Sequence, residues 1–179
     1  MLYATRGTML IRRARLPDAA AMAIVHVESW RAAYVGLVPA VVLNELSVQA
    51  RAASWTRILG DGEARGSRSW VAVLEGRVVG FISAGPTRDA DDHRGQVGEV
   101  YAIYLVPTAW GRGVGGELLR MAEDDLSERG YRAATIWVLA GNTRARRFYA
   151  QCGYEADGGA QKESIGPAVL PSVRYRRPL

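Results

Sequence analysis

The stretch Leu105–Gly116, LVPTAWGRGVGG, places a cluster of glycines between an apolar run and an amphipathic one. Ordering glycine costs more backbone entropy than ordering any other residue, so such a cluster needs a physical reason. Consecutive backbone N–H groups at the start of a helix lack intrahelical partners and favour a bound anion. The sequence therefore predicts an anion-binding backbone loop formed by Gly111, Arg112, Gly113, Val114, Gly115 and Gly116.

Two other kinds of phosphate loop fit this stretch poorly. Its glycines match the G-x-G-x-x-G spacing of dinucleotide sites, but that motif alone is weak evidence. Residues 106–110 lengthen the turn before the first glycine, and the next apolar run, 133–140, ends without an acidic residue for a ribose. A P-loop would end in Gly-Lys-Ser/Thr, whereas this chain continues Gly116-Glu117-Leu118. A plain tight turn would need one glycine, so we favour a shallow backbone cradle.

The composition is typical of one domain. The chain has 179 residues, of which 49% are apolar, enough for one hydrophobic core. We expect residues 1–8 to form a loose leader and residues 9–179 a single domain. No apolar run is long enough to cross a membrane, so no membrane partner is expected. The single cysteine, Cys152, excludes an internal disulfide and fits the reducing cytoplasm, while two histidines, His26 and His93, argue against a metal site.

The net charge of +5 comes almost wholly from arginine, because Lys162 is the only lysine. Arginine suits forked contacts with phosphate, so a phosphate-bearing ligand is one interpretation. A solvated basic surface is the other, since the arginines are scattered and the acidic stretch 89–92 offsets them. Without a basic stripe, nucleic acid is not an expected partner.

Hydrophobic periodicity and turn signals predict a mixed sheet flanked by helices, an α/β fold that some schemes class as α+β. Strands are expected at 9–13, on both sides of the Glu75-Gly76 turn, at 98–106, at 133–139 and at 169–176. Helices are expected at 17–33, 38–46, from Ser47 onward, at 114–129 and at 142–152, with Ser47 and Asn142 as N-caps. The glycine loop would then follow a strand that is covered on both faces.

A second motif follows at an independent spacing. The stretch NTRARRFYAQCGY, residues 142–154, keeps the register Asn-x-x-Ala-x-x-aliphatic/aromatic-Tyr-x-x-x-Gly-Phe/Tyr. Together with Trp110–Gly115 it resembles the GCN5-related N-acetyltransferase (GNAT) family, whose acetyl-coenzyme A loop reads Gln/Arg-x-x-Gly-x-Gly/Ala. The resemblance covers about residues 9–177. The departure is Trp110, where the family usually has glutamine or arginine.

The resemblance implies an N-acetyltransferase that takes acetyl-CoA as its donor substrate and acetylates a primary amine by direct attack in a ternary complex. It implies that the strand ending Ile103-Tyr104-Leu105 splays from strand 133–139, binds pantetheine with its freed backbone groups and polarises the acetyl carbonyl with one N–H. Tyr149 aligns with the family's general acid, and Asn142 would cap its helix and contact the cofactor. A packed aromatic and a plain cap are the alternatives for these two residues.

The base is predicted from the strand itself. Glu99 is the one carboxylate in strand 98–106, and strand alternation places it on the same face as Tyr101 and Ile103. Apolar neighbours can raise the pKa of such a carboxylate, so that it takes a proton from the amine directly or through water. The alternatives are water as the base, or a Glu99 that reaches solvent or an arginine.

The acceptor, a small-molecule or peptide amine, is expected between the first two helices, the hairpin and the last strand. Trp30, Tyr34 and Trp55 either line this pocket or simply pack on the sheet. The alternative function is a non-catalytic, acyl-CoA-binding regulatory module on the same fold. The resemblance also implies a homodimer.

Overall fold

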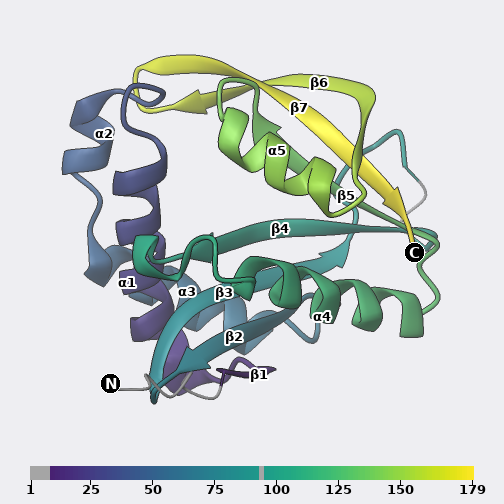
Figure 1. The fold of residues 1–179 in the computed structure, drawn as a ribbon, viewed down its shortest axis with the longest axis horizontal. Coiled ribbons are helices and arrows are strands. Elements are labelled where there is room, and N and C mark those ends of the chain that lie inside the picture. The colour runs from purple at the N-terminus through teal and green to yellow at the C-terminus, as the bar shows by residue number, and fades with distance from the viewer. Residues whose placement is uncertain (1–8, 93–94) are drawn as a thin grey trace, which may run out of the picture.

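In the computed structural model, which describes residues 9–92 and 95–179, the backbone forms one seven-stranded sheet of order β1-β2-β3-β4-β5-β7-β6 (Figure 1). The strands are β1 (Met9–Arg13), β2 (Arg68–Leu74), β3 (Arg77–Pro86), β4 (Val97–Leu105), β5 (Ala133–Leu139), β6 (Glu155–Ile165) and β7 (Ala168–Pro178). The α-helices are α1 (Ala19–Ala33), α2 (Ala40–Asn44), α3 (Val48–Asp61), α4 (Val114–Glu128) and α5 (Thr143–Gln151). The predicted leader, residues 1–8, and His93 lie outside the described residues.

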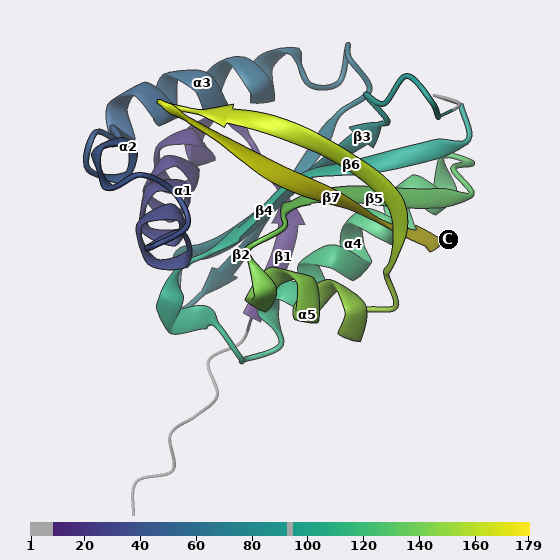
Figure 2. The same cartoon turned by 90° about the horizontal axis from the view of Figure 1, so that it is seen from above.

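Helices cover both faces of the sheet, as Figure 2 shows for α1 and α3 on one side and α4 and α5 on the other. On the first side, buried α1 residues and Trp55 of α3 pack on Val71 and Phe81. On the second side, α4 packs on Ile82 and Val100. The predicted mixed α/β fold is confirmed. No helix of the described chain combines the length and apolar character that a membrane span requires.

The two central strands separate halfway along their length. β4 and β5 pair in parallel from Val97↔Ala133 to Val100↔Ile136, and no pairing follows beyond that point. On its other edge β4 stays paired with β3 up to Leu105, but the register shifts so that Tyr101 has no partner. Such a β-bulge bends and twists a strand. The predicted splay of β4 from β5 is therefore confirmed, and it begins at the bulge.

The bulge corrects one prediction about faces. Strict alternation places Glu99 and Ile103 on the same face of β4. In the structure Val100 and Ile103 both pack in the core on the α4 side, whereas Ala102 and Tyr104 pack on the α1 side. Because the extra residue at Tyr101 breaks the alternation, Glu99, which neighbours Val100, lies on the face opposite Ile103.

The structure contains one strand more than the sequence predicts. β6, with the sequence EADGGAQKESI, forms a hairpin with β7 through the turn after Ile165. It is polar, mostly exposed and interrupted by a register shift between Ala156 and Ala160, so it lacks the alternation on which strand prediction depends. This edge strand supplies one wall of the site described next.

Candidate active site

The splay opens a cavity of about 1110 Å³ between the C-terminal half of α1, β4, the glycine loop, β5, α5 and β6. Most of the predicted site residues line it: Glu99, Ile103, Tyr104, Leu105, Gly111, Gly113, Gly115, Gly116, Asn142 and Tyr149. Two predicted residues do not. Val114 is buried in the core with α4, and the exposed Arg112 is not part of the cavity wall. Because its side chain is buried, Val114 can offer a ligand only its backbone.

The glycine loop presents free backbone donors to this cavity. Gly111 and Gly113 have φ of +68° and +82°, a left-handed conformation that favours glycine. Gly113 is also the N-cap of α4. Within the described chain, the N–H groups of 114–116 have no hydrogen-bond partner. A Cβ built on Gly111, Gly113 or Gly116 would meet nothing within 4 Å, so there is open space beside these amides for an anion.

Gly115 has a different role in the loop. A Cβ at this position would lie 3.2 Å from the Cζ atom of Phe148, on α5. That distance is tight for a carbon–carbon contact. The absence of a side chain at Gly115 therefore lets α5 pack closely against the first turn of α4, which brings the two predicted motifs to the same cavity.

Trp110 and Arg144 form a stacked pair at the start of the loop. The indole Nε1 of Trp110 donates a hydrogen bond to the Leu105 carbonyl at 3.0 Å, which fixes the ring against the end of β4. The guanidinium of Arg144, from the first turn of α5, stacks on this ring. Burial lowers the pKa of Arg144, and no carboxylate of the described chain pairs with it. Both residues line the cavity, so an unpaired cation adjoins the loop's free amides.

Tyr149 is held deep in the cavity. Its side chain is 6% exposed and its ring lies 5.4 Å from Phe148 and 6.2 Å from Tyr154, centroid to centroid. Burial raises the pKa of the phenol, and the nearby hydroxyls of Tyr34 and Tyr104 raise it further. Its hydroxyl has no hydrogen-bond partner among residues 9–92 and 95–179. The group is therefore a protonated donor at neutral pH that still has its proton to offer.

Asn142 caps the helix that carries Tyr149. Its Oδ1 accepts a hydrogen bond from the Ala145 amide at 3.1 Å, as predicted. Burial raises the pKa of the nearby Tyr34 phenol, and a hydrogen bond with the Asn142 side chain partly opposes that shift. Asn142 thus links the start of α5 to the C-cap residue of α1.

Glu99 is buried and paired, which is one of the alternatives that the sequence analysis leaves open. Its side chain is 1% exposed. The Arg88 amide donates to Oε2 at 2.8 Å, and the Arg88 guanidinium donates to both carboxylate oxygens. The guanidinium also lies 4.5 Å from the centroid of the Tyr101 ring. Both oxygens of Glu99 are therefore engaged by one arginine.

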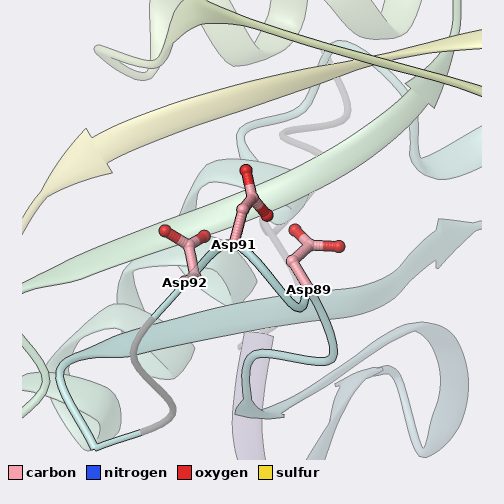
Figure 3. Close-up of side chains that lie close together, drawn as sticks. All are labelled: Asp89, Asp91 and Asp92. Carbon is pink, nitrogen blue, oxygen red and sulfur yellow. The ribbon is translucent and has the colours of Figure 1, made fainter.

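The sequence suggests that the acidic stretch 89–92 is solvated and only offsets the arginine charge. In the structure its carboxylates are part of an ion-pair network. Figure 3 shows Asp89, Asp91 and Asp92 gathered on one loop with their carboxylates close together. Arg174 of β7 contacts Asp89 at 3.0 Å and Asp91 at 2.9 Å, and Arg176 contacts Asp92 at 2.8 Å. These arginines already supply the positive charge that a bound cation would provide. The network fixes the loop that carries Arg88 against the edge of the cavity.

The aromatic side of the cavity holds Trp30 and Tyr34 but not Trp55. The rings of Trp30 and Tyr34 meet edge to face at 4.7 Å, and both line the cavity. Trp55 is instead buried between α3 and the sheet, where its Nε1 donates to His26 Nδ1 at 3.3 Å. Burial, with a smaller effect of nearby Arg51, lowers the pKa of His26 to about 4. Of the two alternatives for Trp55, packing on the sheet is the one that the structure shows.

Comparison with known proteins identifies the family. Residues 30–154, more than half of the chain, match the sequence model of the Acetyltransferase (GNAT) family. The chain belongs to the GNAT family. It is 34% identical over 137 residues to YuaI, an uncharacterized N-acetyltransferase of Bacillus subtilis, a match that covers 74% of this chain and 72% of YuaI.

Solved structures share the fold of this GNAT chain. PaiA N-acetyltransferase from Thermoplasma acidophilum, solved in complex with coenzyme A, superposes with a TM-score of 0.75 at 16% identity, covering 96% of this chain and 99% of PaiA. YncA from Salmonella typhimurium, solved with its cofactor acetyl-CoA, gives a TM-score of 0.70 at 20% identity, covering 96% and 94% of the two chains. These two proteins, which share the fold with this chain, were solved with coenzyme A and with acetyl-CoA, respectively.

Sequence reasoning missed several residues that line the cavity of this GNAT protein. Arg144 lies inside the second motif, but its stacking on Trp110 depends on how α5 packs beside α4. Gln161 and Glu163 were missed because β6 was not predicted as a strand. Arg88 lies in a loop just before the acidic stretch, and no periodicity there indicates where its side chain points. These residues were missed because their roles come from tertiary placement.

Proposed function

We propose that this GNAT protein transfers an acetyl group from acetyl-CoA to a primary amine, by direct attack in a ternary complex, with Tyr149 as the general acid. The observation that carries the proposal is the meeting of three features in one cavity. These are the free amides at the start of α4, the unpaired edge of β4 and the available hydroxyl of Tyr149. Separately they have ordinary structural explanations, but together they match the needs of acyl transfer from a phosphate-bearing thioester.

The residues present fit the donor substrate. The amides of 114–116, at the positive end of the α4 dipole, suit the pyrophosphate of coenzyme A, and the open space beside Gly111 and Gly113 leaves room for it. Arg144 adds a guanidinium at the same place. The edge of β4 from Ile103 to Leu105 offers backbone groups to the amides of pantetheine, as an added strand would.

The chain's own groups then perform the transfer. A backbone N–H near Ile103–Leu105 donates to the thioester oxygen and stabilises the charge that develops there. The neutral amine nitrogen forms a bond to the carbonyl carbon, and the bond from that carbon to sulfur breaks. Tyr149 gives its hydroxyl proton to the departing sulfur. The surplus proton on the nitrogen then transfers to the phenolate. The products are an amide and a free thiol, and Tyr149 is protonated again.

The amine must lose a proton before it attacks. Glu99 is the base proposed from the sequence, and its place on the cavity wall supports that role. Its pairing with Arg88 weighs against it, because both of its oxygens already accept hydrogen bonds from that arginine. We therefore propose water as the base, with Glu99 positioning Arg88 and the loop that follows it.

Acetyl-CoA turnover across a panel of amines tests the function. Release of coenzyme A thiol that depends on an added amine, with a matching mass increase of one acetyl group on that amine, is the expected result. Tight binding of acetyl-CoA without turnover of any amine would contradict the proposal and support the non-catalytic acyl-CoA-binding module. The panel should include small amines and peptides with free N-termini or lysine side chains.

Two further expectations from the sequence are part of the proposal. The single cysteine supports a cytoplasmic enzyme, and the family supports a homodimer. Light scattering of the purified chain in solution measures the oligomeric state directly. A mass near 39 kDa, about twice the 19.5 kDa of one chain, is expected.

A further inference from the structure

We infer that Glu163 binds the acceptor, and that this acceptor is a cationic aliphatic amine with no carboxylate next to its nitrogen. The inference rests on the proposed function and names the substrate class for the same cavity. Three carboxylates of the described chain line the cavity: Asp89, Glu99 and Glu163. Arg174 holds the first and Arg88 holds the second. Glu163 has no such partner within the described chain, and its Oε1 accepts a hydrogen bond from the Ser172 hydroxyl at 2.6 Å.

The hairpin register places Glu163 against the aromatic side of the cavity. In the β6–β7 ladder, Glu163 lies opposite Leu170 and two residues from Ile165, so these three side chains share one face. Ile165 and Leu170 pack in the same cluster as Trp30 and Tyr34. Glu163 therefore projects from β6 toward the end of α1, and its Oε2 is available to a ligand.

The surroundings of Glu163 suit a cation. Trp30 and Tyr34 present aromatic rings to the cavity, and the Trp30 and Tyr104 rings lie 6.4 Å apart, centroid to centroid. Burial raises the pKa of both Tyr34 and Tyr104, and the negative charge of Glu163 adds to both shifts. Ring faces attract ammonium groups, and a carboxylate completes such a site with a charge-assisted hydrogen bond. A primary amine that enters as an ammonium ion would be held in the cavity that the phenol of Tyr149 also lines.

The same chemistry disfavours one class of amine. A free α-amino acid carries a carboxylate about 3 Å from its nitrogen, and an unpaired carboxylate on the wall repels it. Arg51, whose guanidinium lies 5.9 Å from the Trp30 ring centroid, is a nearby cation, but it is not among the residues that line the cavity. An aliphatic diamine has no negative group and should bind, whereas glycine should not.

Steady-state kinetics of Glu163→Gln with 1,4-diaminobutane and with glycine test the inference. We expect the KM for the diamine to rise at least tenfold, because a charged hydrogen bond is lost, while the KM for acetyl-CoA stays within twofold. The KM of Glu163→Asp for the diamine should lie between the values for the wild type and for Glu163→Gln. Glu155→Gln is the matched control, because Glu155 is exposed on the same strand and does not line the cavity.

The possible outcomes separate the two proposals. If the wild-type chain acetylates the diamine and Glu163→Gln does so with an unchanged KM, the inference is wrong and the proposed function stands. A wild-type preference for glycine over the diamine would also overturn the inference. If the wild-type chain acetylates no amine in the panel, the proposed function fails and the inference fails with it. The unchanged KM for acetyl-CoA shows that the variant is folded.

Discussion

The guanidinium carbon of Arg144 lies 3.3 Å from the centroid of the Trp110 ring, so a cation from α5 stacks on the loop that precedes α4. Trp110 occupies the position where the family usually has glutamine or arginine. The indole replaces that side chain's polar group, and its hydrogen bond to the Leu105 carbonyl fixes the ring in place. The stacked arginine returns a positive charge to the loop from a different element of the chain.

Arg144→Ala should therefore weaken coenzyme A binding. We expect the Kd for coenzyme A to rise roughly tenfold, the effect of losing a hydrogen bond to a charged group, with little change in kcat at saturating donor. Isothermal titration calorimetry measures the first quantity. Arg57→Ala, an exposed arginine on α3, is the control for the loss of one positive charge. Equal Kd values for these two variants would show that Arg144 does not contact the donor.

Tyr149→Phe should lower kcat by roughly 10², within the usual range for a proton transfer, because the departing sulfur loses its proton donor. Acetyl-CoA affinity should stay nearly the same, since the phenol contributes no binding charge. Tyr131→Phe, at a tyrosine that does not line the cavity, controls for the loss of a hydroxyl elsewhere. A rate within twofold of the wild-type rate would remove Tyr149 from the mechanism.

Glu99→Gln distinguishes the two proposed routes for the amine proton. If water is the base, the acidic limb of the pH–rate profile keeps its shape, although the variant loses the buried ion pair with Arg88. If Glu99 is the base, that limb flattens, because no group in the variant titrates in its place. The measurement is kcat/KM for one good acceptor across the acidic range.

His26 makes stability depend on pH in a defined window. Burial lowers its pKa to about 4 in the folded chain, against 6.5 for the ordinary side chain. The unfolded chain therefore binds a proton first as the pH falls, so stability is fully present above pH 6.5 and declines from there to about pH 4. The slope is at most about 1.4 kcal/mol per pH unit. Urea unfolding of wild type and His26→Gln at several pH values measures it, and parallel curves would contradict this assignment.

The fold could be predicted from the sequence wherever the signal is local. The glycine loop, the Glu75-Gly76 turn and the caps at Ser47 and Asn142 are set by neighbouring residues, and the structure confirms these elements. β6 was missed because an exposed edge strand has no buried face and so no alternation. The bulge at Tyr101 was missed because it arises from the register between β3 and β4, which only pairing reveals.

In the candidate site, too, the part set by local sequence could be predicted and the part set by tertiary placement could not. The donor side follows from two sequence motifs, whose residues meet because Gly115 lets α5 pack on α4. The acceptor side depends on segments far apart in the chain that line one cavity, such as β6 with Glu163 and the end of α1. Side chains of that kind have no fixed spacing in sequence, so the substrate could not be predicted from motifs.

A crystal structure of the protein with coenzyme A bound tests the central claim most directly. We expect the pyrophosphate oxygens to lie within hydrogen-bond distance of amide nitrogens between Gly111 and Gly116, and the sulfur to lie within reach of the Tyr149 hydroxyl. A pyrophosphate bound elsewhere, with this loop empty, or a Tyr149 hydroxyl turned away from the sulfur, would contradict the account.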